Sequence, residues 1–251
     1  MLLQGKNTIV YGGAGAIGGA AARAFAREGA TVHLVGRTRA TLDEVAGDIR
    51  SAGGAAEVAA FDVFDESAVD AHAQSVVDGF GSLDVSFNAI AHPYAFGKPV
   101  VEMDYADLER DVTSRLRAFW LTTKAAAPHM IRQGAGVVLA FGGDGPPTPN
   151  LGGLQVSLGA VEMLRRILAC ELGPQGIRVL TLQTGGVPES LPGDMPQEAR
   201  EEIARGLVEP TMLGRAATLA DVGNAAAFAA SDWARALTAT KLNLTVGAVV
   251  D

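Results

Sequence analysis

The sequence has few of the features that mark several large classes of protein. Its single cysteine, Cys170, excludes an intrachain disulfide framework and fits a reducing compartment. It has no run of basic residues and a formal net charge of −8, so we do not expect a nucleic acid as a partner. Nor does any uncharged apolar stretch reach about 18 residues, the length that a membrane span requires.

Further absences narrow the choice. The histidines show no spacing typical of a metal site, and we expect none. The first residues lead directly into an apolar run, so we expect no signal peptide and a cytoplasmic location. Cys170 lies in a helical pattern, ILACELG, where we expect a buried structural thiol. Hydrophobic residues make up 48 % of the chain and glycines number 31, which fits a compact α/β protein.

One segment is rich in glycine. Residues 7–37 read NTIVYGGAGAIGGAAARAFAREGATVHLVGR, an apolar run followed by glycines, a helical pattern and a second apolar run. Glycines between a strand and a helix allow a tight turn close to a pyrophosphate, which the N–H groups at the helix N-terminus can hold. The segment therefore predicts a dinucleotide cradle. Its expected cofactor contacts are Gly12, Gly13, Gly15, Ala16, Ile17 and Gly18.

The end of the second apolar run bears on the choice of cofactor. A carboxylate there would bind the ribose 2′-hydroxyl of NAD, whereas an arginine suits the additional phosphate of NADP. Gly36 is followed by Arg37 and Thr38, with no carboxylate. We therefore expect NADP(H), with Arg37 and Thr38 near the phosphate. A solvated arginine at the start of a helix is the alternative interpretation.

Apolar runs and helical patterns alternate along the chain. Strands are expected at residues 8–11, 31–35, 57–61, 83–88, 136–141, 177–183 and 241–246. Helices are expected after the glycines and at residues 41–51, 65–80, 105–130, 153–172 and 219–231. This alternation predicts a single domain over residues 1–251, a Rossmann fold with a doubly wound, seven-stranded parallel sheet and helices on both faces.

The alternation is interrupted between residues 186 and 212. Four prolines flank a short charged helical pattern, PQEAREEIARGL. An insertion of this length after the carboxyl end of a strand is often a lid over the ligand crevice, and we expect a substrate lid at about residues 186–212. A surface excursion without fixed structure is the alternative.

Over its full length the chain resembles the short-chain dehydrogenase/reductase family, a single-domain Rossmann fold that usually forms tetramers or dimers. YGGAGAIG at residues 11–18 resembles the family's T-G-x-x-x-G-x-G turn, and FDV at residues 61–63 its adenine-contacting D-V. NAIA at residues 88–91 stands where N-N-A-G is usual, and TGGV at residues 184–187 replaces P-G-x-[VI]. The resemblance adds the expected cofactor contacts Asp62, Val63, Asn88, Ala89, Gly185 and Val187.

The positions that carry catalysis in that family differ here. The family uses a serine after the fifth strand, a Tyr-x-x-x-Lys on the next helix and an asparagine on the helix before. In this sequence Gly143 stands at the serine position, Leu154 and Leu158 at the tyrosine and lysine positions, and Arg115 at the asparagine. A positioned acid or base is typically worth roughly 10² to 10⁴ in rate, and leucine cannot supply it. An ordinary alcohol dehydrogenase is therefore disfavoured.

Two reductions survive this loss. An iminium ion is already cationic and can accept a hydride beside a carboxylate, for which Asp144 is the candidate. An activated alkene can accept a hydride at carbon and a proton from water or another side chain. His92 and Tyr94, directly after the fourth strand, could donate that proton, and Arg115 could contact the cofactor or an anionic group of the substrate. A turn, an exposed loop and a surface or interface salt bridge are the respective structural alternatives.

We therefore expect a cytoplasmic, NADPH-dependent reductase of an imine or activated alkene, acting on a small molecule. The resemblance implies a homo-oligomer, a tetramer or dimer, that associates through the helices at residues 105–130 and 153–172. A non-redox NADP(H)-binding protein on the same scaffold, either a cofactor sensor or a lyase or cyclase, is the alternative hypothesis.

Overall fold

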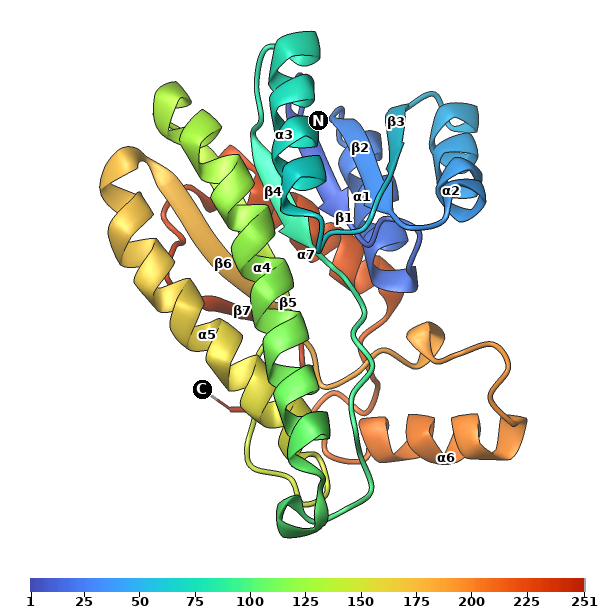
Figure 1. Cartoon of the computed structure of the whole chain (residues 1–251). Coiled ribbons are helices and arrows are strands. Elements are labelled where there is room, and N and C mark those ends of the chain that lie inside the picture. The colour runs from blue at the N-terminus through green and yellow to red at the C-terminus, as the bar shows by residue number, and fades with distance from the viewer. Residues whose placement is uncertain (251) are drawn as a thin grey trace.

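The computed structural model describes residues 1–250. A seven-stranded sheet lies at its centre, in the order β3-β2-β1-β4-β5-β6-β7 (Figure 1). All neighbouring strands are parallel. The strands are β1 (Asn7–Tyr11), β2 (Thr31–Gly36), β3 (Ala55–Ala60), β4 (Val85–Asn88), β5 (Gly136–Gly142), β6 (Ile177–Gln183) and β7 (Lys241–Asn243). The predicted seven-stranded Rossmann-type sheet is confirmed.

Helices cover both faces of the sheet (Figure 1). They are α1 (Ala16–Arg27), α2 (Arg39–Ser51), α3 (Glu66–Phe80), α4 (Tyr105–Gln133), α5 (Gly152–Leu172), α6 (Gln197–Val208) and α7 (Leu219–Ala230). Helices α1, α2 and α7 pack on one face, and α3, α4 and α5 on the other. Because successive side chains of a strand point to opposite faces, Val10 joins the first core and its neighbours Ile9 and Tyr11 the second. Burial on both faces explains the nearly continuous apolar character of the strands.

Local signals fix several helix ends. Helix α3 begins after Asp65, whose carboxylate accepts a hydrogen bond from the Ala68 N–H, and it ends at Gly81 with a left-handed φ of 85°. Helix α7 begins with a capping box between Thr218 and Asp221. None of the helices within residues 1–250 has both the length and the apolar character that crossing a membrane requires.

Two expectations are wrong. Strand β7 ends at Asn243 instead of residue 246, because the Asn243 side chain accepts hydrogen bonds from both the N–H and the hydroxyl of Thr245 and turns the chain. Cys170 is exposed rather than buried. Helix α5 buries Ala169 against the sheet, and the next residue is turned about 100° around the helix axis, toward solvent.

The carboxyl ends of the parallel strands share one edge of the sheet. Figure 1 shows the N-termini of α4 and α5 at this end, together with α6, which stands apart from the other helices. Helix α6 buries none of its residues. The loops that follow the strands, including the glycine turn after β1, therefore lie at one end of the molecule.

Candidate functional site

The strand order changes direction at β1 and β4, which lie side by side although they are far apart in the chain. In open parallel sheets this is where a ligand crevice forms. The N–H of Ala89 donates to the Tyr11 carbonyl over 2.9 Å, so the segment after β4 continues against the turn after β1. A Cβ added at Gly12 would lie 2.7 Å from the Ala89 carbonyl oxygen. Only glycine allows the two backbones this approach.

The glycine turn is closed on itself. Gly12 has a φ of 79°, and its carbonyl accepts the Gly15 N–H over 2.9 Å. A Cβ added at Gly18 would collide with the Gly12 carbonyl oxygen and lie 2.8 Å from its carbon. A Cβ at Gly13 would lie 2.8 Å from the Leu34 side chain. At each of these three glycines a larger side chain would therefore clash with a neighbouring atom.

Helix α1 starts directly at this turn. Its N-cap is Gly15, which offers no side chain to the first N–H groups, and its first turn, beginning with Ala16 and Ile17, contains no acidic residue. The first N–H groups of a helix have no partner within it and carry the positive end of the helix dipole. The residues thus leave an uncapped helix end that suits an anion such as a pyrophosphate.

The first residues after β2 carry a free cation. Arg37 is exposed and makes no hydrogen bond or ion pair with any other residue in the range 1–250. By contrast, Arg39 pairs with Asp43 over 3.3 Å on the same helix. Thr38 is the N-cap of α2, but its side chain makes no capping hydrogen bond. Arg37 and the Thr38 hydroxyl are therefore available to an anionic ligand at this edge.

The remaining predicted cofactor contacts also follow strand ends. Asp62 is exposed after β3 and accepts the Phe64 N–H over 3.0 Å, whereas Val63 is buried. The Asn88 side chain, at the end of β4, donates to the Thr122 hydroxyl over 3.2 Å. After β6, Gly185 leads to Val187, which is buried in a small cluster against Ile17 of α1.

A small pocket beside β4 brings together Asn88 and two of the predicted catalytic residues. Its walls come from β4, β5, α4, α5 and the loop after β4. Its lining is Asn88, Ile90, His92, Arg115, Phe119, Ala140, Phe141 and Val161. Burial, reinforced by the positive charge of Arg115, lowers the pKa of His92 to about 4. His92 is therefore neutral near pH 7 and can donate or accept a hydrogen bond there.

Arg115 is the only charged side chain of this pocket. Its Nε donates to the Ser157 hydroxyl over 3.0 Å, and Ser157 in turn donates to the Leu154 carbonyl over 2.7 Å. Burial lowers the pKa of Arg115, while Tyr94 and Asp111 act in the opposite direction. Tyr94 itself is exposed on the loop after β4, with its ring 5.8 Å from that of Phe96.

Asp144 is separated from this group. Its carboxylate pairs with the Lys241 ammonium over 2.8 Å, and its carbonyl accepts a hydrogen bond from the Gln183 amide. It does not line the pocket that contains Arg115. The ion pair compensates the negative charge that an iminium ion would need.

The end of β5 and the residue after it have positive φ angles, which residues other than glycine rarely adopt. Gly143 has a φ of 77°, and a Cβ there would lie 2.8 Å from Cβ and Cγ of Gln183. At Gly142, with a φ of 133°, an added Cβ would lie 2.6 Å from Leu158. Leu158 therefore covers the end of β5 with an apolar surface.

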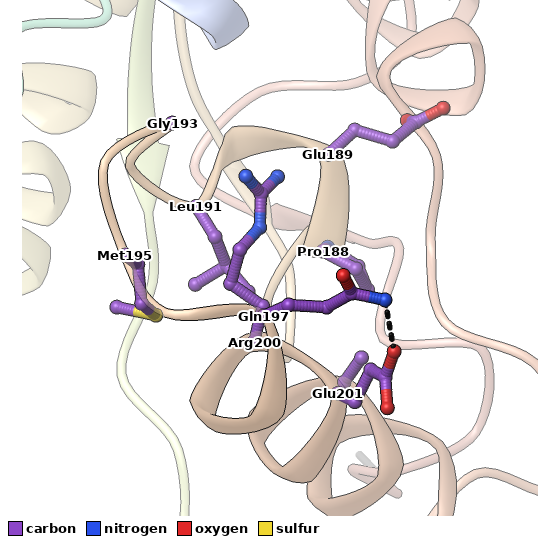
Figure 2. Close-up of a pocket in the computed structure, with 9 residues that line it drawn as sticks. Pro188, Glu189, Leu191, Gly193, Met195, Gln197, Arg200 and Glu201 are labelled. Carbon is purple, nitrogen blue, oxygen red and sulfur yellow. Dashed lines mark hydrogen bonds between the residues drawn. The ribbon is translucent and has the colours of Figure 1, made fainter.

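The segment between β6 and α7 lines a pocket of about 600 Å³ that is open to solvent. Figure 2 shows the guanidinium of Arg200 extending from α6 into this pocket past Leu191. Gln197 donates to Glu201 over 2.8 Å, and both side chains line the pocket (Figure 2). The lining is Pro188, Glu189, Leu191, Gly193, Met195, Gln197, Arg200, Glu201 and Ala204. The short 3₁₀ helix η3 (Pro188–Ser190) contacts α1, which places this segment beside the glycine turn.

Both ends of this segment are attached to the body of the protein. At its start Val187 is buried against Ile17 of α1, and the Glu189 carboxylate accepts the N–H of Leu219 at the start of α7. At the other end the N–H of Met212 donates to the Val246 carbonyl over 3.1 Å. Between these attachments the segment forms the helices η3 and α6, and α6 buries none of its residues.

Sequence reasoning missed the partners of the candidate residues. Ser157 has no local signal as the partner of Arg115, because the two residues lie on different helices. Lys241 and Gln183 have none either, because they reach Asp144 from distant strands.

Comparisons with known proteins give consistent results. A family model described as enoyl-(acyl carrier protein) reductase matches residues 12–248. A cis-4-hydroxycyclohexanecarboxylate dehydrogenase from Sinomonas cyclohexanicum is 34% identical over 230 residues, 89% of this chain and 88% of that protein. A solved short-chain type dehydrogenase/reductase from Mycobacterium ulcerans has a TM-score of 0.89 at 25% identity, covering 99% of this chain and 91% of that one. A 7α-hydroxysteroid dehydrogenase complexed with NADH and 7-oxo glycochenodeoxycholic acid has a TM-score of 0.84 at 26% identity, covering 99% and 96%.

Proposed function

This chain belongs to the short-chain dehydrogenase/reductase family, and on that basis we propose that it is an NADP(H)-dependent reductase of an imine, an iminium ion or an activated C=C bond. The family makes it an oxidoreductase that uses a nicotinamide cofactor. The preference for NADP(H), the direction of the reaction and the substrate class are parts of the proposal. When bound, the cofactor supplies the hydride.

The observation that carries the proposal is the closed glycine turn. Gly12 and Gly18 are packed so tightly that a Cβ at either would strike backbone, and the uncapped start of α1 lies next to them. A pyrophosphate fits this arrangement because the N–H groups of the helix end face it. The residues that would hold the rest of the cofactor are Arg37 and Thr38 at the 2′-phosphate, Asp62 and Val63 at the adenine, and Asn88, Ala89, Gly185 and Val187 nearer the nicotinamide.

The preference for NADP(H) is supported by the charges after β2. No carboxylate stands at the end of this strand to receive a ribose hydroxyl. Arg37 has no partner among residues 1–250, whereas the neighbouring Arg39 is occupied by Asp43. A free guanidinium favours a phosphate, with which it can form two charge-assisted hydrogen bonds.

We further propose that the family's usual proton-transfer residues are absent. Gly143, Leu154, Leu158 and Arg115 stand at the positions of the serine, tyrosine, lysine and asparagine. The positive φ of Gly143, which a serine rarely adopts, and the apolar side chain of Leu158 beside Gly142 support this assignment. His92, whose pKa lies at about 4, orients a substrate by hydrogen bonding, and the proton comes from water or Tyr94.

The segment at about residues 186–212 acts as a lid in this proposal. The lack of buried residues in α6 and the contact of η3 with α1 support a part that moves over the crevice. Val187 holds its start and Met212 its end. A segment that buries little apolar surface can move away from the body of the protein at a low cost in free energy.

We also propose a homo-oligomer, a dimer or tetramer, that associates through α4 and α5. These two helices pack against each other and expose large apolar side chains to solvent. The exposed residues are Trp120, Ile131, Val156, Met163 and Ile167. Covering them in an interface would remove apolar area from water.

A non-redox NADP(H)-binding protein is the second candidate, favoured by the apolar Leu154 and Leu158. Calorimetric titration with NADPH and separately with NADH, followed by an NADPH-oxidation assay on a panel of imines and enones, distinguishes the two. We expect tighter binding of NADPH and turnover of at least one compound. Binding without turnover would favour the second candidate, and binding of neither cofactor would refute both.

A further inference from the structure

We propose that Arg115 is the binding site for a carboxylate on the substrate, which is then an organic acid with apolar groups near that carboxylate. The role of this acid as a substrate rests on the proposed function. The carboxylate site itself rests only on the geometry around Arg115, and the two can therefore fail separately.

The guanidinium of Arg115 is held in place by α5. Its Nε donates to Ser157, which is fully buried, and the Ser157 hydroxyl is itself fixed because it donates to the Leu154 carbonyl. Nε is thus occupied, and both Nη atoms remain. A side chain already fixed in its binding geometry loses little conformational freedom when a ligand arrives. The two Nη atoms form the end of the fork that a carboxylate can bind with both of its oxygens.

Arg115 has no counterion among residues 1–250. No Asp or Glu carboxylate lies within 4.0 Å of it, and its Nη atoms make no hydrogen bond to another residue in that range. The nearest carboxylate on its own helix, Asp111, is occupied. One Asp111 oxygen accepts the Ala95 N–H over 2.8 Å and the other pairs with Arg110 over 3.0 Å. A partly buried cation without a partner is costly, and an anionic ligand removes that cost.

The surroundings favour an anion with an apolar body. Ile90, Phe119, Phe141 and Val161 supply apolar walls, while Asn88 and His92 are the other polar groups. His92 is neutral near pH 7. Arg115 is therefore the one charged group of the lining, and Asp111, which acts on its pKa, lies outside that lining. The free space beside these atoms is about 10 Å³, room for about one water molecule, so a carboxylate enters only when the lining side chains move apart. A substrate that carries only a positive charge is disfavoured here.

The test compares ligands that differ in charge but hardly in shape. Benzoate is paired with benzamide, and crotonate with crotonamide, in calorimetric titrations of the full chain. Arg115→Gln removes the charge, and Arg115→Lys keeps the charge without the fork. The matched control is Arg117→Gln, which removes one exposed arginine two residues further along α4. Arg117 bonds to the Phe64 carbonyl over 3.1 Å, outside the pocket.

We expect the unmodified protein to bind at least one carboxylate about tenfold tighter than its amide, the size of one charge-assisted contact. Arg115→Gln abolishes this preference, Arg115→Lys keeps part of it and Arg117→Gln keeps all of it. Ser157→Ala leaves the charge of Arg115 but removes the hydrogen bond to its Nε, and we expect it to weaken carboxylate binding several-fold. This variant replaces Arg115→Gln in the test if circular dichroism shows that Arg115→Gln does not fold. Two results would overturn the proposal. One is that the unmodified protein does not prefer the carboxylate in either pair, which includes the case in which it binds none of the four compounds. The other is that the preference persists in Arg115→Gln.

Titrations without cofactor and with saturating NADPH separate this proposal from the previous one. A carboxylate preference in a protein that does not bind NADPH would refute the reductase and leave the Arg115 site standing. NADPH binding and turnover of neutral compounds without any carboxylate preference would refute the Arg115 site and leave the reductase standing.

Discussion

Acid is expected to destabilise this fold through a histidine pair buried beneath α3. His33, on β2, is 2% exposed, and its ring lies 4.6 Å from that of Phe80 and 6.3 Å from that of His72 on α3. Nε2 of His33 and Nδ1 of His72 are buried without a hydrogen-bond partner among residues 1–250. Protonation would therefore place unpaired positive charge in the core.

The size of the effect follows from the pKa of His33. Burial, together with the charge of His72, lowers it from 6.5 to about 4, and burial lowers that of His72 to about 4 as well. Between about pH 6.5 and pH 4 the unfolded chain binds more protons than the folded one, because its histidines have the higher pKa. The free energy of unfolding therefore falls as the pH falls through this interval. The contribution of the neutral histidines to the free energy of unfolding is complete above about pH 6.5 and lost by about pH 4. For His33 this contribution amounts to about 3 kcal/mol. His72 is half-buried, and solvent reduces its share.

Urea unfolding followed by far-UV circular dichroism at about pH 7 and about pH 4.5 measures this loss. The comparison is His33→Leu, which keeps an apolar side chain of similar size but cannot titrate. The carboxylates titrate equally in both proteins, so their contribution cancels in the difference. We expect the unmodified protein to lose about 2 to 3 kcal/mol more than the variant over this interval. Equal losses in the two proteins would show that His33 is not held neutral by burial.

Three further predictions concern the cofactor and the assembly. Gly18→Ala is expected to abolish NADPH binding and to cost several kcal/mol of stability, since its Cβ meets the Gly12 backbone; unchanged calorimetry or urea unfolding would contradict this. Arg37→Asp is expected to weaken NADPH more than NADH, whereas the control Arg39→Ala changes neither; equal loss of both cofactors would refute the phosphate contact. Size-exclusion chromatography with light scattering is expected to show a multiple of 25.8 kDa at micromolar concentration, and a monomer would refute self-association.

The sheet and most helices could be predicted because their signals are local. Strands buried on both faces are nearly pure apolar runs, and the glycine turn sits between a strand and a helix as the sequence indicates. Helix α6 could be predicted from its charged pattern despite the surrounding prolines. The end of β7 could not, because the side chain of Asn243 rather than a break in hydrophobicity stops the strand.

The candidate site was predictable only in its residue types. Asn88, His92 and Arg115 meet in one pocket because the ends of parallel strands share an edge. The partner of Asp144 could not be foreseen, since Lys241 lies 97 residues further along the chain. Nor does any pattern reveal that Ser157 fixes Arg115, because that contact depends on how α4 and α5 pack.

The left-handed backbone at Gly143 has a consequence for the evolutionary freedom of this chain. A serine introduced there would adopt an unfavourable φ, and its Cβ would press against Gln183, so the single change would cost stability before any hydroxyl reached the crevice. Under the proposed assignment of Gly143 to the serine position, a Ser-Tyr-Lys arrangement would need substitutions at residues 143, 154 and 158, and the first of them already costs stability.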